Sequence, residues 1–331
     1  MSQYKEEKKR AIEAVVLASR LCQHVQSNLI DGTSISKNDK SPVTIADFGA
    51  QAIVSLVLQK YFPQIPMVGE EDASALREEN NPLSSKVFEA VRSVLPQAND
   101  AEILAAIDYG TYEGGAKGRH WCLDPIDGTK GFLRGDQYAV ALALIEDGSV
   151  VLGVLGCPNL PLDIHNSDAQ RGSLFVAVQG EGAQSLDMNG VFISDIQVDQ
   201  AVQKHDLIFC ESVETGHTSQ SDSAKIADIL GIKKEPVRID SQCKYAIVAR
   251  GEASIYLRLP TRIGYQEKIW DHGAGVIVIE EAGGRVSDIF GRKLDFSLGR
   301  TLAKNKGVVV TSGTLHKEVI QAVQEVLQNQ E

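Results

Sequence analysis

Residues 121–135 read WCLDPIDGTKGFLRG, with two aspartates on either side of a proline. Three apolar residues lead into Asp124, so we expect this aspartate at the end of a buried strand. Pro125 fixes the backbone that follows it and donates no hydrogen bond, which leaves the nearby carbonyl groups free. Asp127 stands three residues after Asp124 and can point to the same side. The spacing predicts two carboxylates held close together at a strand end.

Two carboxylates at this distance repel each other unless they are protonated or bridged by cations. A site that offers only oxygen ligands favours Mg²⁺ over zinc. Gly128 lets the backbone approach a phosphate closely, and the hydroxyl of Thr129 can orient a water molecule. The alternative interpretation is an Asx-turn, in which both aspartates only cap the local backbone.

Three further acidic positions bear on this choice. MVGEED ends an apolar run at Glu70, SPVTIADF places Asp47 beside Thr44 at a helix start, and KIWDHGAG places Asp271 before small residues that open a helix. Taken singly, these acids are explained by a solvated turn and two helix caps. Taken together, they form an acid set suited to two or more magnesium ions.

The first part of the chain predicts helices packed on an antiparallel sheet. Residues 10–29 have the periodicity of an amphipathic helix, and residues 41–62 open with an extended Ser-Pro segment before turning helical. Residues 77–86, REENNPLSSK, indicate a loop. Residues 138–158 form two apolar runs joined by Glu-Asp-Gly-Ser, which is typical of a β-hairpin, and residues 173–186 indicate a further strand and turn.

After residue 205 short apolar strands alternate with helical segments, which is typical of an α/β unit. The helix that follows Trp270 has a stop signal at Gly283 and Gly284. We therefore expect an α+β domain over residues 1–203 and an α/β domain over residues 204–331.

Composition limits the classes of function. The chain has 331 residues, of which 43% are hydrophobic and 23% charged, as in an ordinary soluble protein. A net charge of −11 argues against electrostatic binding of nucleic acid or anionic lipid, so an anionic substrate would need cations as mediators. The amino end is too polar for a signal peptide, and no apolar run approaches the ~18 residues needed to span a bilayer. We expect a cytoplasmic monomer without a membrane partner.

The five cysteines lie far apart and form no Cys-x-x-Cys pair. Such a scattered, odd set predicts reduced core thiols rather than a disulfide framework or a zinc site. The positions are Cys22, Cys122, Cys157, Cys210 and Cys243.

The motifs D-P-I-D-G-T, G-E-E and W-D-x-x-A-G, in this order, resemble the lithium-sensitive, magnesium-dependent phosphatases, which include the inositol monophosphatases and fructose-1,6-bisphosphatases. The longer stretches SPVTIADF, LDPIDGTKGF, VETGH, DSQCKYAIVARGEASIYLRLP and YQEKIWDHGAG resemble the 3′(2′),5′-bisphosphate nucleotidases in particular. The resemblance extends over almost the whole chain. It implies a layered α-β-α-β-α sandwich, with an antiparallel N-terminal sheet and a C-terminal α/β domain.

The resemblance also implies two or three Mg²⁺ ions and their ligands. Glu70, Asp124 and the carbonyl of Ile126 would hold the first ion. Asp124, Asp127 and Asp271 would hold the second, and Glu70 would also serve a weaker third.

The remaining roles concern the reaction and the substrate. Thr129 and Asp47 would activate the attacking water as a general-base pair. Ser241, Lys244, Arg258 and His217 would contact the nucleotide, including its 5′-phosphate, although each taken singly is explained as a surface charge or a loop residue. The substrate contacts expected in full are Gly128, Thr129, His217, Ser241, Lys244, Arg258 and Asp271.

The expected activity is removal of the 3′-phosphate from 3′-phosphoadenosine 5′-phosphate, which gives AMP and phosphate. 3′-Phosphoadenosine 5′-phosphosulfate is a second expected substrate. Disposal of the by-product 3′-phosphoadenosine 5′-phosphate would link the protein to sulfate assimilation. Two alternatives stay open from the sequence. One is an inositol phosphate phosphatase with the same metal site, and the other is a sensor that binds the nucleotide without turnover.

Overall fold

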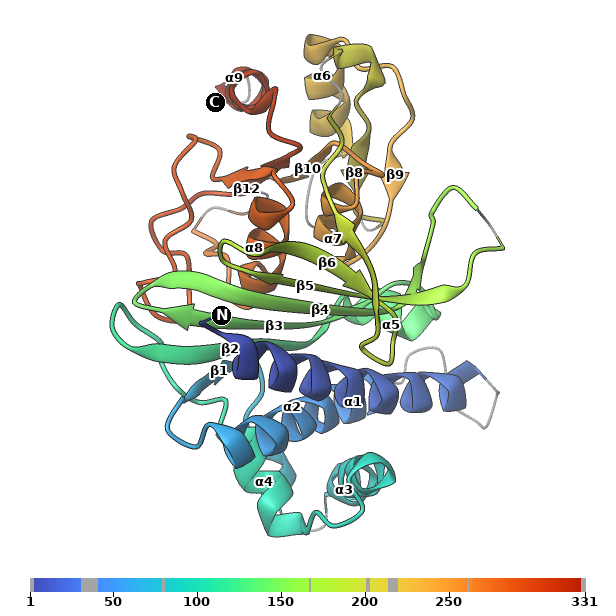
Figure 1. The fold of residues 1–331 in the computed structure, drawn as a ribbon, viewed down its shortest axis with the longest axis vertical. Helices are drawn as coiled ribbons and strands as arrows, with labels where there is room; N and C mark the ends of the chain where they lie inside the picture. Colours follow the sequence, from blue (N-terminus) through green and yellow to red (C-terminus); the bar gives the residue numbers. More distant parts are fainter. Residues whose placement is uncertain are drawn as a thin grey trace.

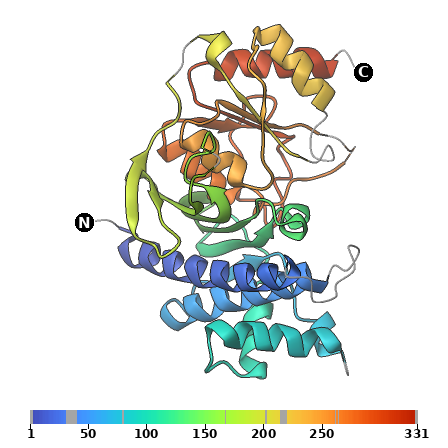
Figure 2. The same cartoon turned by 90° about the vertical axis from the view of Figure 1, so that its right-hand side faces the viewer.

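The computed structural model describes residues 3–30, 41–78, 81–166, 168–200, 203–213, 220–260, 262 and 264–328. Helices and sheets alternate in layers along the long axis of the molecule, and the stacking is visible from two directions (Figures 1 and 2). A helical layer is followed by a first sheet, a pair of central helices, a second sheet and an outer helical layer. The expected α-β-α-β-α sandwich is confirmed.

The first sheet has the strand order β1-β2-β3-β4-β5-β6-β7, which is also the order along the chain. Its β3–β4 hairpin turns through Asp147 and Gly148, whose φ angles of 48° and 75° are those of a type I′ turn. The sheet is antiparallel, as expected, except that β1 pairs with β2 in parallel. The bounds are β1 Met67–Gly69, β2 Arg119–Asp127, β3 Ala139–Glu146, β4 Ser149–Pro161, β5 Arg171–Val178, β6 Gly182–Leu186 and β7 Phe192–Ile196.

The first helical layer corrects two expectations about proline. The segment expected to be extended at Ser41 is already helical, with Pro42 in the first turn, where its missing N–H has no helical partner to lose. The expected loop over residues 77–86 contains the start of another helix: Asn81 caps it by accepting a hydrogen bond from the backbone N–H of Leu83. The helices are α1 Lys5–Ile30, α2 Ser41–Tyr61, α3 Pro82–Val94 and α4 Asp100–Asp108, with the 3-10 turn η1 Ala75–Arg77 before α3.

The second sheet has the order β11-β12-β10-β8-β9 and mixes parallel with antiparallel pairs. Strand β11 is an element that the sequence pattern did not indicate. The strands are β8 Phe209–Glu211, β9 Val237–Arg238, β10 Ile255–Arg258, β11 Arg285–Ser287 and β12 Val308–Thr311. The helices are α7 Cys243–Ala249 and α8 Gly273–Glu281 between the sheets, α6 Gln220–Leu230 and α9 His316–Gln328 outside, and the 3-10 turn η2 Lys204–Asp206.

Three apolar clusters fill the spaces between these layers. Strand β3 serves two of them, because successive side chains point to opposite faces of a sheet. Leu142 and its alternate neighbours pack toward α1 and α2, whereas Ala141 and Ala143 face α8. Helix α8 approaches both β3 and β4 closely: a Cβ added at Gly273 would lie 3.2 Å from Ala143 Cβ, and one added at Gly153 of β4 would lie 2.4 Å from Ile277 Cγ2. This tight packing fixes the helix that follows Asp271.

Helix α2 corrects the expectation that no segment is apolar enough to cross a bilayer. Residues Pro42–Tyr61 have the length and composition for it, with a mean hydropathy of 1.3. However, 72% of that window is buried inside the protein, in contact with α1, α3, α4 and β2. Its apolar side chains are core residues.

Candidate active site

The two aspartates of the LDPIDGT segment lie at the carboxyl end of β2. Asp124 pairs with Ala141 of β3, and Asp127 pairs with Ala139, so β2 contains one more residue than β3 over this interval. The extra residue makes a β-bulge, a device that re-aims side chains at the end of a ladder. Both carboxylates line the same cavity, as the spacing predicted.

Gly128 joins this strand end to the short helix α5, Thr129–Arg134. Its φ of 94° lies in the left-handed region that favours glycine. A Cβ at this position would lie 2.8 Å from the Cβ of Ser241, in a segment between the two sheets. The glycine therefore lets the two halves of the site meet, in addition to the expected approach to a phosphate.

The cavity has a volume of about 390 Å³ and is bounded by segments of both sheets. It gathers ten of the sequence-predicted positions whose side chains or backbone the structure describes. They are Glu70, Asp124, Ile126, Asp127, Gly128, Thr129, Ser241, Lys244, Arg258 and Asp271.

Among the described residues, Asp47 is the sequence-predicted position that does not line this cavity. Asp47 lies in the second turn of α2 rather than at its start, so it is not a helix cap. Helix α2 packs against α5, whose first residue is Thr129. Burial and the negative charges of Glu71 and Glu70 raise the pKa of Asp47 well above its usual range. His217 lies outside the described residues.

The carboxylates of the cavity strongly affect one another. Burial, followed by the charge of Glu70, raises the pKa of Asp124 well above its ordinary value. Enclosure and the charges of Asp271, Glu71 and Asp127 raise the pKa of Glu70 to about 8, although its side chain reaches solvent through the cavity. Burial and the charge of Asp271 raise the pKa of Asp127 to about 6, against the opposing charges of nearby cations. The set is electrostatically unfavourable without a positive partner.

Asp124 shows most clearly that this set fits a metal ion. Its side chain is 2% exposed, and its Oδ1 atom has no hydrogen-bond partner among the described residues. An unpaired carboxylate oxygen in such a place carries a large desolvation cost that a bound cation would offset. Because carboxylate and carbonyl oxygens are the ligands that Mg²⁺ prefers, the residues present fit that ion.

A second acidic group is compensated within the protein. Ligand atoms of Glu267, Asp271 and His272 lie within 4.8 Å of one another. Arg258 occupies this group, with Nε 2.8 Å from Glu267 and Nη2 2.8 Å from Asp271. Burial opposes ionisation of Glu267, but the hydrogen bond and charge of His272 and the charge of Arg258 lower the pKa of Glu267 to about 2. Arg258 therefore neutralises acids of the site and orients Asp271.

Lys244 provides a buried positive charge on the same side of the cavity. It lies in α7 and is 4% exposed, and its ammonium lies 3.4 Å from the carbonyl oxygen of Ile239 and 5.1 Å from the centre of the Tyr256 ring. Burial lowers the pKa of Lys244, whereas the charges of nearby groups such as Asp127 raise it. A lysine in this position can receive an anionic group of a ligand.

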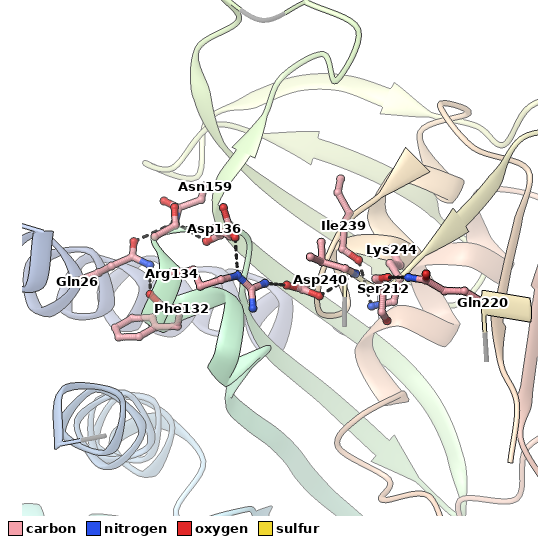
Figure 3. A network of polar contacts seen from close by, with 12 residues as sticks. Gln26, Phe132, Arg134, Asp136, Asn159, Ser212, Gln220, Ile239, Asp240 and Lys244 are labelled. Carbon is pink, nitrogen blue, oxygen red and sulfur yellow. Dashed lines mark hydrogen bonds and ion pairs between the residues drawn. The ribbon is translucent and has the colours of Figure 1, made fainter. Parts of the chain in front are cut away.

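A network of polar contacts connects the first helical layer to the Lys244 segment (Figure 3). Gln26 of α1 donates to the carbonyl of Phe132 in α5 at 2.8 Å. Arg134 at the end of α5 pairs with Asp240, which also accepts a hydrogen bond from the backbone of Val213. The network therefore ties α5, which begins at Thr129, to the segment that precedes α7.

Sequence reasoning missed several residues of the cavity. Tyr265, Lys268 and Trp270 belong to the stretch YQEKIWDHGAG, but only the aspartate in it was singled out. Gln242 stands between Ser241 and Lys244 and was likewise overlooked. Gln242, Tyr265 and Trp270 carry no charge, and Lys268 taken singly is explained as a surface charge, so nothing in the sequence alone separated these residues from ordinary ones. The expectation for the cysteines is confirmed, because all five are buried and unpaired.

Comparison with known proteins agrees with this geometry. A model of the inositol monophosphatase family matches residues 4–328. A 3′(2′),5′-bisphosphate nucleotidase of Emericella nidulans is 47% identical over 98% of this chain and 99% of its own, and one of Oryza sativa is 46% identical over 99% and 96%.

Solved structures with low sequence identity share the fold. The inositol monophosphatase of Anabaena has a TM-score of 0.63 at 19% identity, over 98% of this chain and 97% of its own. One from Zymomonas mobilis has a TM-score of 0.63 at 20% identity, over 98% and 100%. The resemblance seen in the sequence motifs is confirmed, and the chain belongs to the inositol monophosphatase family.

Proposed function

We propose that this protein is a magnesium-dependent phosphomonoesterase that converts 3′-phosphoadenosine 5′-phosphate and water to AMP and phosphate. The observation that carries the proposal is one cavity with two opposite requirements. Its acid set, with the unpaired oxygen of Asp124, requires cations, and its buried Lys244 offers a charge to a second anionic group. The nucleotidases at 46–47% identity are named for a substrate class with two phosphate positions.

The metal ligands proposed are those implied by the motifs. Glu70, Asp124 and the Ile126 carbonyl would hold one ion, and Asp124, Asp127 and Asp271 a second, with Glu70 also near a third. When bound, Mg²⁺ would neutralise the phosphoryl oxygens and make a coordinated water more acidic. Metal coordination would thus offset the mutual repulsion of the carboxylates in the acid set.

The chain's own groups would supply positioning and proton transfer. Thr129 begins α5 beside the metal ligands, and we assign its hydroxyl to orient the attacking water. Asp47, with its raised pKa, is suited to accept the proton of that pair. The water oxygen forms a bond to phosphorus while the bond to the 3′-oxygen breaks, and the departing oxygen takes up a proton.

The nucleotide would lie between the acid set and α7. Ser241, Lys244 and Arg258 line that side of the cavity, and His217 is assigned to it from the motif alone. Lys244 is the group we assign to the 5′-phosphate. Arg258, already paired with two carboxylates, would act chiefly by orienting Asp271.

A phosphate-release assay with a panel of substrates tests the proposal. We expect Mg²⁺-dependent release from 3′-phosphoadenosine 5′-phosphate, and slower release from 3′-phosphoadenosine 5′-phosphosulfate. Faster turnover of inositol phosphates would favour the alternative suggested by the shared fold with inositol monophosphatases. Tight nucleotide binding without phosphate release would indicate a sensor.

Lithium sensitivity belongs to the same proposal. Li⁺ in a magnesium position would bring half the charge and stabilise the phosphoryl transition state less. We expect LiCl to inhibit at concentrations where NaCl does not. An equal response to both salts would contradict the assignment of the metal site.

The remaining assignments complete the proposal. We infer a monomer in the cytoplasm that disposes of a by-product of sulfate assimilation. We also propose a domain boundary near residue 203, because the chain passes from the first sheet to the second between Ile196 and Phe209. Limited proteolysis and gel filtration test the boundary and the oligomeric state.

A further inference from the structure

Gln242 bonds to residues of two other segments, at the end of β2 and at the start of α8. It is 2% exposed, directly precedes α7 and lines the cavity. Ser241 before it has a φ of 66°, in the left-handed region that a non-glycine residue adopts only when its surroundings impose it. In this conformation the backbone N–H of Gln242 donates to the carboxylate of Asp127. The backbone of Gln242 therefore contacts one of the proposed metal ligands.

The side chain of Gln242 holds the segment that carries a second proposed ligand. Its Nε2 donates to the carbonyl oxygen of Trp270 at 2.9 Å, and its Oε1 accepts from the N–H of Gly275 at 3.2 Å. Trp270 immediately precedes Asp271, and Gly275 lies in the first turn of α8. The N–H groups of a first helical turn need partners outside the helix, and Gln242 supplies one of them. The side-chain amide of Gln242 therefore bonds to the backbone on both sides of Asp271.

The hydrogen bonds of Gln242 hold in place two carboxylates, Asp127 and Asp271, that repel each other. Asp127 and Asp271 line the same cavity, and two carboxylates that share a site repel each other unless a cation bridges them. They come from different parts of the chain: Asp127 ends β2 of the first sheet, and Asp271 precedes α8. Gln242 bonds to the carboxylate of Asp127 through its backbone and to both flanks of Asp271 through its side chain.

We propose that Gln242 is a positioning residue that sets the separation of Asp127 and Asp271 and thereby the affinity of the magnesium site they share. The inference rests on the proposed function for the identity of the ion. The neutral side chain of Gln242 would not bind the metal itself but would fix the geometry on which metal binding depends. Loss of outer partners that orient metal ligands typically weakens metal affinity or activity by about 10–100-fold.

Gln242→Met tests this role, because methionine keeps the length of the side chain and removes both amide bonds. Gln242→Asn keeps the amide but is too short to reach both partners, and it serves if the methionine variant fails to fold. Gln324→Met is the matched control: Gln324 in α9 donates one hydrogen bond, at 3.0 Å to the carbonyl of Ile289, and does not line the cavity.

Two measurements separate positioning from simple loss of stability. The first is the Mg²⁺ concentration that gives half of the maximal magnesium-induced rise in Tm, measured without substrate. The second is the Mg²⁺ concentration for half-maximal phosphate release, together with kcat and KM. We expect both Gln242 variants to need about tenfold or more Mg²⁺ in each measurement, with a lower kcat, and the control to stay within about twofold of wild type.

The proposal is overturned if the Gln242 variants have a lower Tm without Mg²⁺ but keep the wild-type magnesium dependence and kcat. That result would make Gln242 a packing residue only. Failure of the proposed function looks different. Wild-type protein would then release no phosphate from any substrate of the panel, while the thermal measurement would still report whether Gln242 controls magnesium binding.

Discussion

The two sides of the cavity solve the problem of buried charge in different ways. On the side of the first sheet, Glu70, Asp124 and Asp127 repel one another, and one oxygen of Asp124 has no partner among the described residues. On the other side, Arg258 is paired with Glu267 and Asp271, each at 2.8 Å. We expect added cations to complete the first side, whereas the second is already largely neutral and presents the buried Lys244 to an anionic group of a ligand. In the proposed function the first is the acid side, which would hold the metal ions, and the second is the substrate side.

Asp124→Asn is the strongest way to break the acid side. The change removes an oxygen shared by two proposed ions. The rate of phosphate release should therefore fall roughly 10³-fold, which corresponds to an activation free energy higher by several kcal/mol. It also relieves repulsion among the carboxylates, so the Tm without Mg²⁺ should stay level or rise. Kinetics and thermal unfolding of the same preparation check both. Near wild-type turnover at saturating Mg²⁺ would contradict the metal assignment.

Lys244→Met is the corresponding test of the substrate side, because methionine preserves the buried stem next to Tyr256. If Lys244 binds the 5′-phosphate, kcat/KM for adenosine 3′,5′-bisphosphate should fall by about 1.5–3 kcal/mol, the worth of a charge-assisted hydrogen bond. Adenosine 3′-monophosphate lacks that group and should lose much less.

The comparison of the two substrates isolates one contact. A general disturbance of α7 would lower kcat/KM for both substrates by the same factor, and the proposed position of the nucleotide would then be wrong. Magnesium dependence should remain that of wild type, in contrast to the Gln242 variants.

Measuring stability over a series of pH values tests the acid side separately, because the protonation of its carboxylates should determine how much Mg²⁺ stabilises the protein. The pKa values of Glu70 and Asp127 are raised to about 8 and about 6 in the folded protein, above the ordinary carboxyl values of roughly 4 in an unfolded chain. The folded protein retains these protons as the pH rises while the unfolded chain loses them. Without Mg²⁺, stability contributed by the protonated groups is present below pH ~4 and is lost as pH approaches 8.

Bound Mg²⁺ would displace these protons, so its stabilising effect should grow with pH. We expect the magnesium-induced rise in Tm to be larger at pH 8 than at pH 5.5. A rise that is the same at both values would show that the carboxylates are already ionised in the metal-free protein. Asp124→Asn should flatten the dependence.

That the acids at the end of β2 share one cavity was predictable from sequence because the information is local. Asp124, Pro125 and Asp127 lie within four residues of one another, and their expected chemistry follows from residue type and spacing. The errors in this part of the chain concern helix starts. Pro42 and Pro82 were interpreted as signs of extended or loop structure, although proline is well accommodated in a first helical turn. Asp47 was weighed as a cap for the same reason.

The substrate side was less predictable because its roles depend on partners far away in the chain. Arg258 forms ion pairs with Glu267 and Asp271, and the residues next to Arg258 in the sequence do not indicate these pairs. Gln242 carries no charge, so its importance follows only from the positions of Asp127 and Trp270 in three dimensions. The parallel pairing of β1 with β2 escaped prediction likewise, since it requires a connection through residues 70–118.

The smallest expected effect concerns His120, a buried polar residue on β2 that lies outside the cavity. Its ring packs against Tyr112, with centroids 5.6 Å apart, and neither ring nitrogen has a hydrogen-bond partner among the described residues. Burial lowers the pKa of His120 to about 4, below the value of roughly 6.5 in an unfolded chain. Between these values the unfolded chain binds the additional proton, so stability is lost as the pH falls from about 6.5 to about 4. This slope has the opposite sign to that of the acid side.

His120→Phe should remove that loss, because a ring of similar shape replaces an unsatisfied and titratable one. We expect Tm to rise by about 2–4 °C at pH 5, corresponding to roughly 1 kcal/mol in a chain of this size, and by less at pH 8. The magnesium-induced rise in Tm should match that of wild type at each pH, since His120 does not line the cavity. A variant that is less stable at both pH values would mean that the imidazole is satisfied in solution, for instance by a bound water. A variant that changed the magnesium response would instead connect this part of β2 to the proposed metal ligand Asp124, four residues further along the strand.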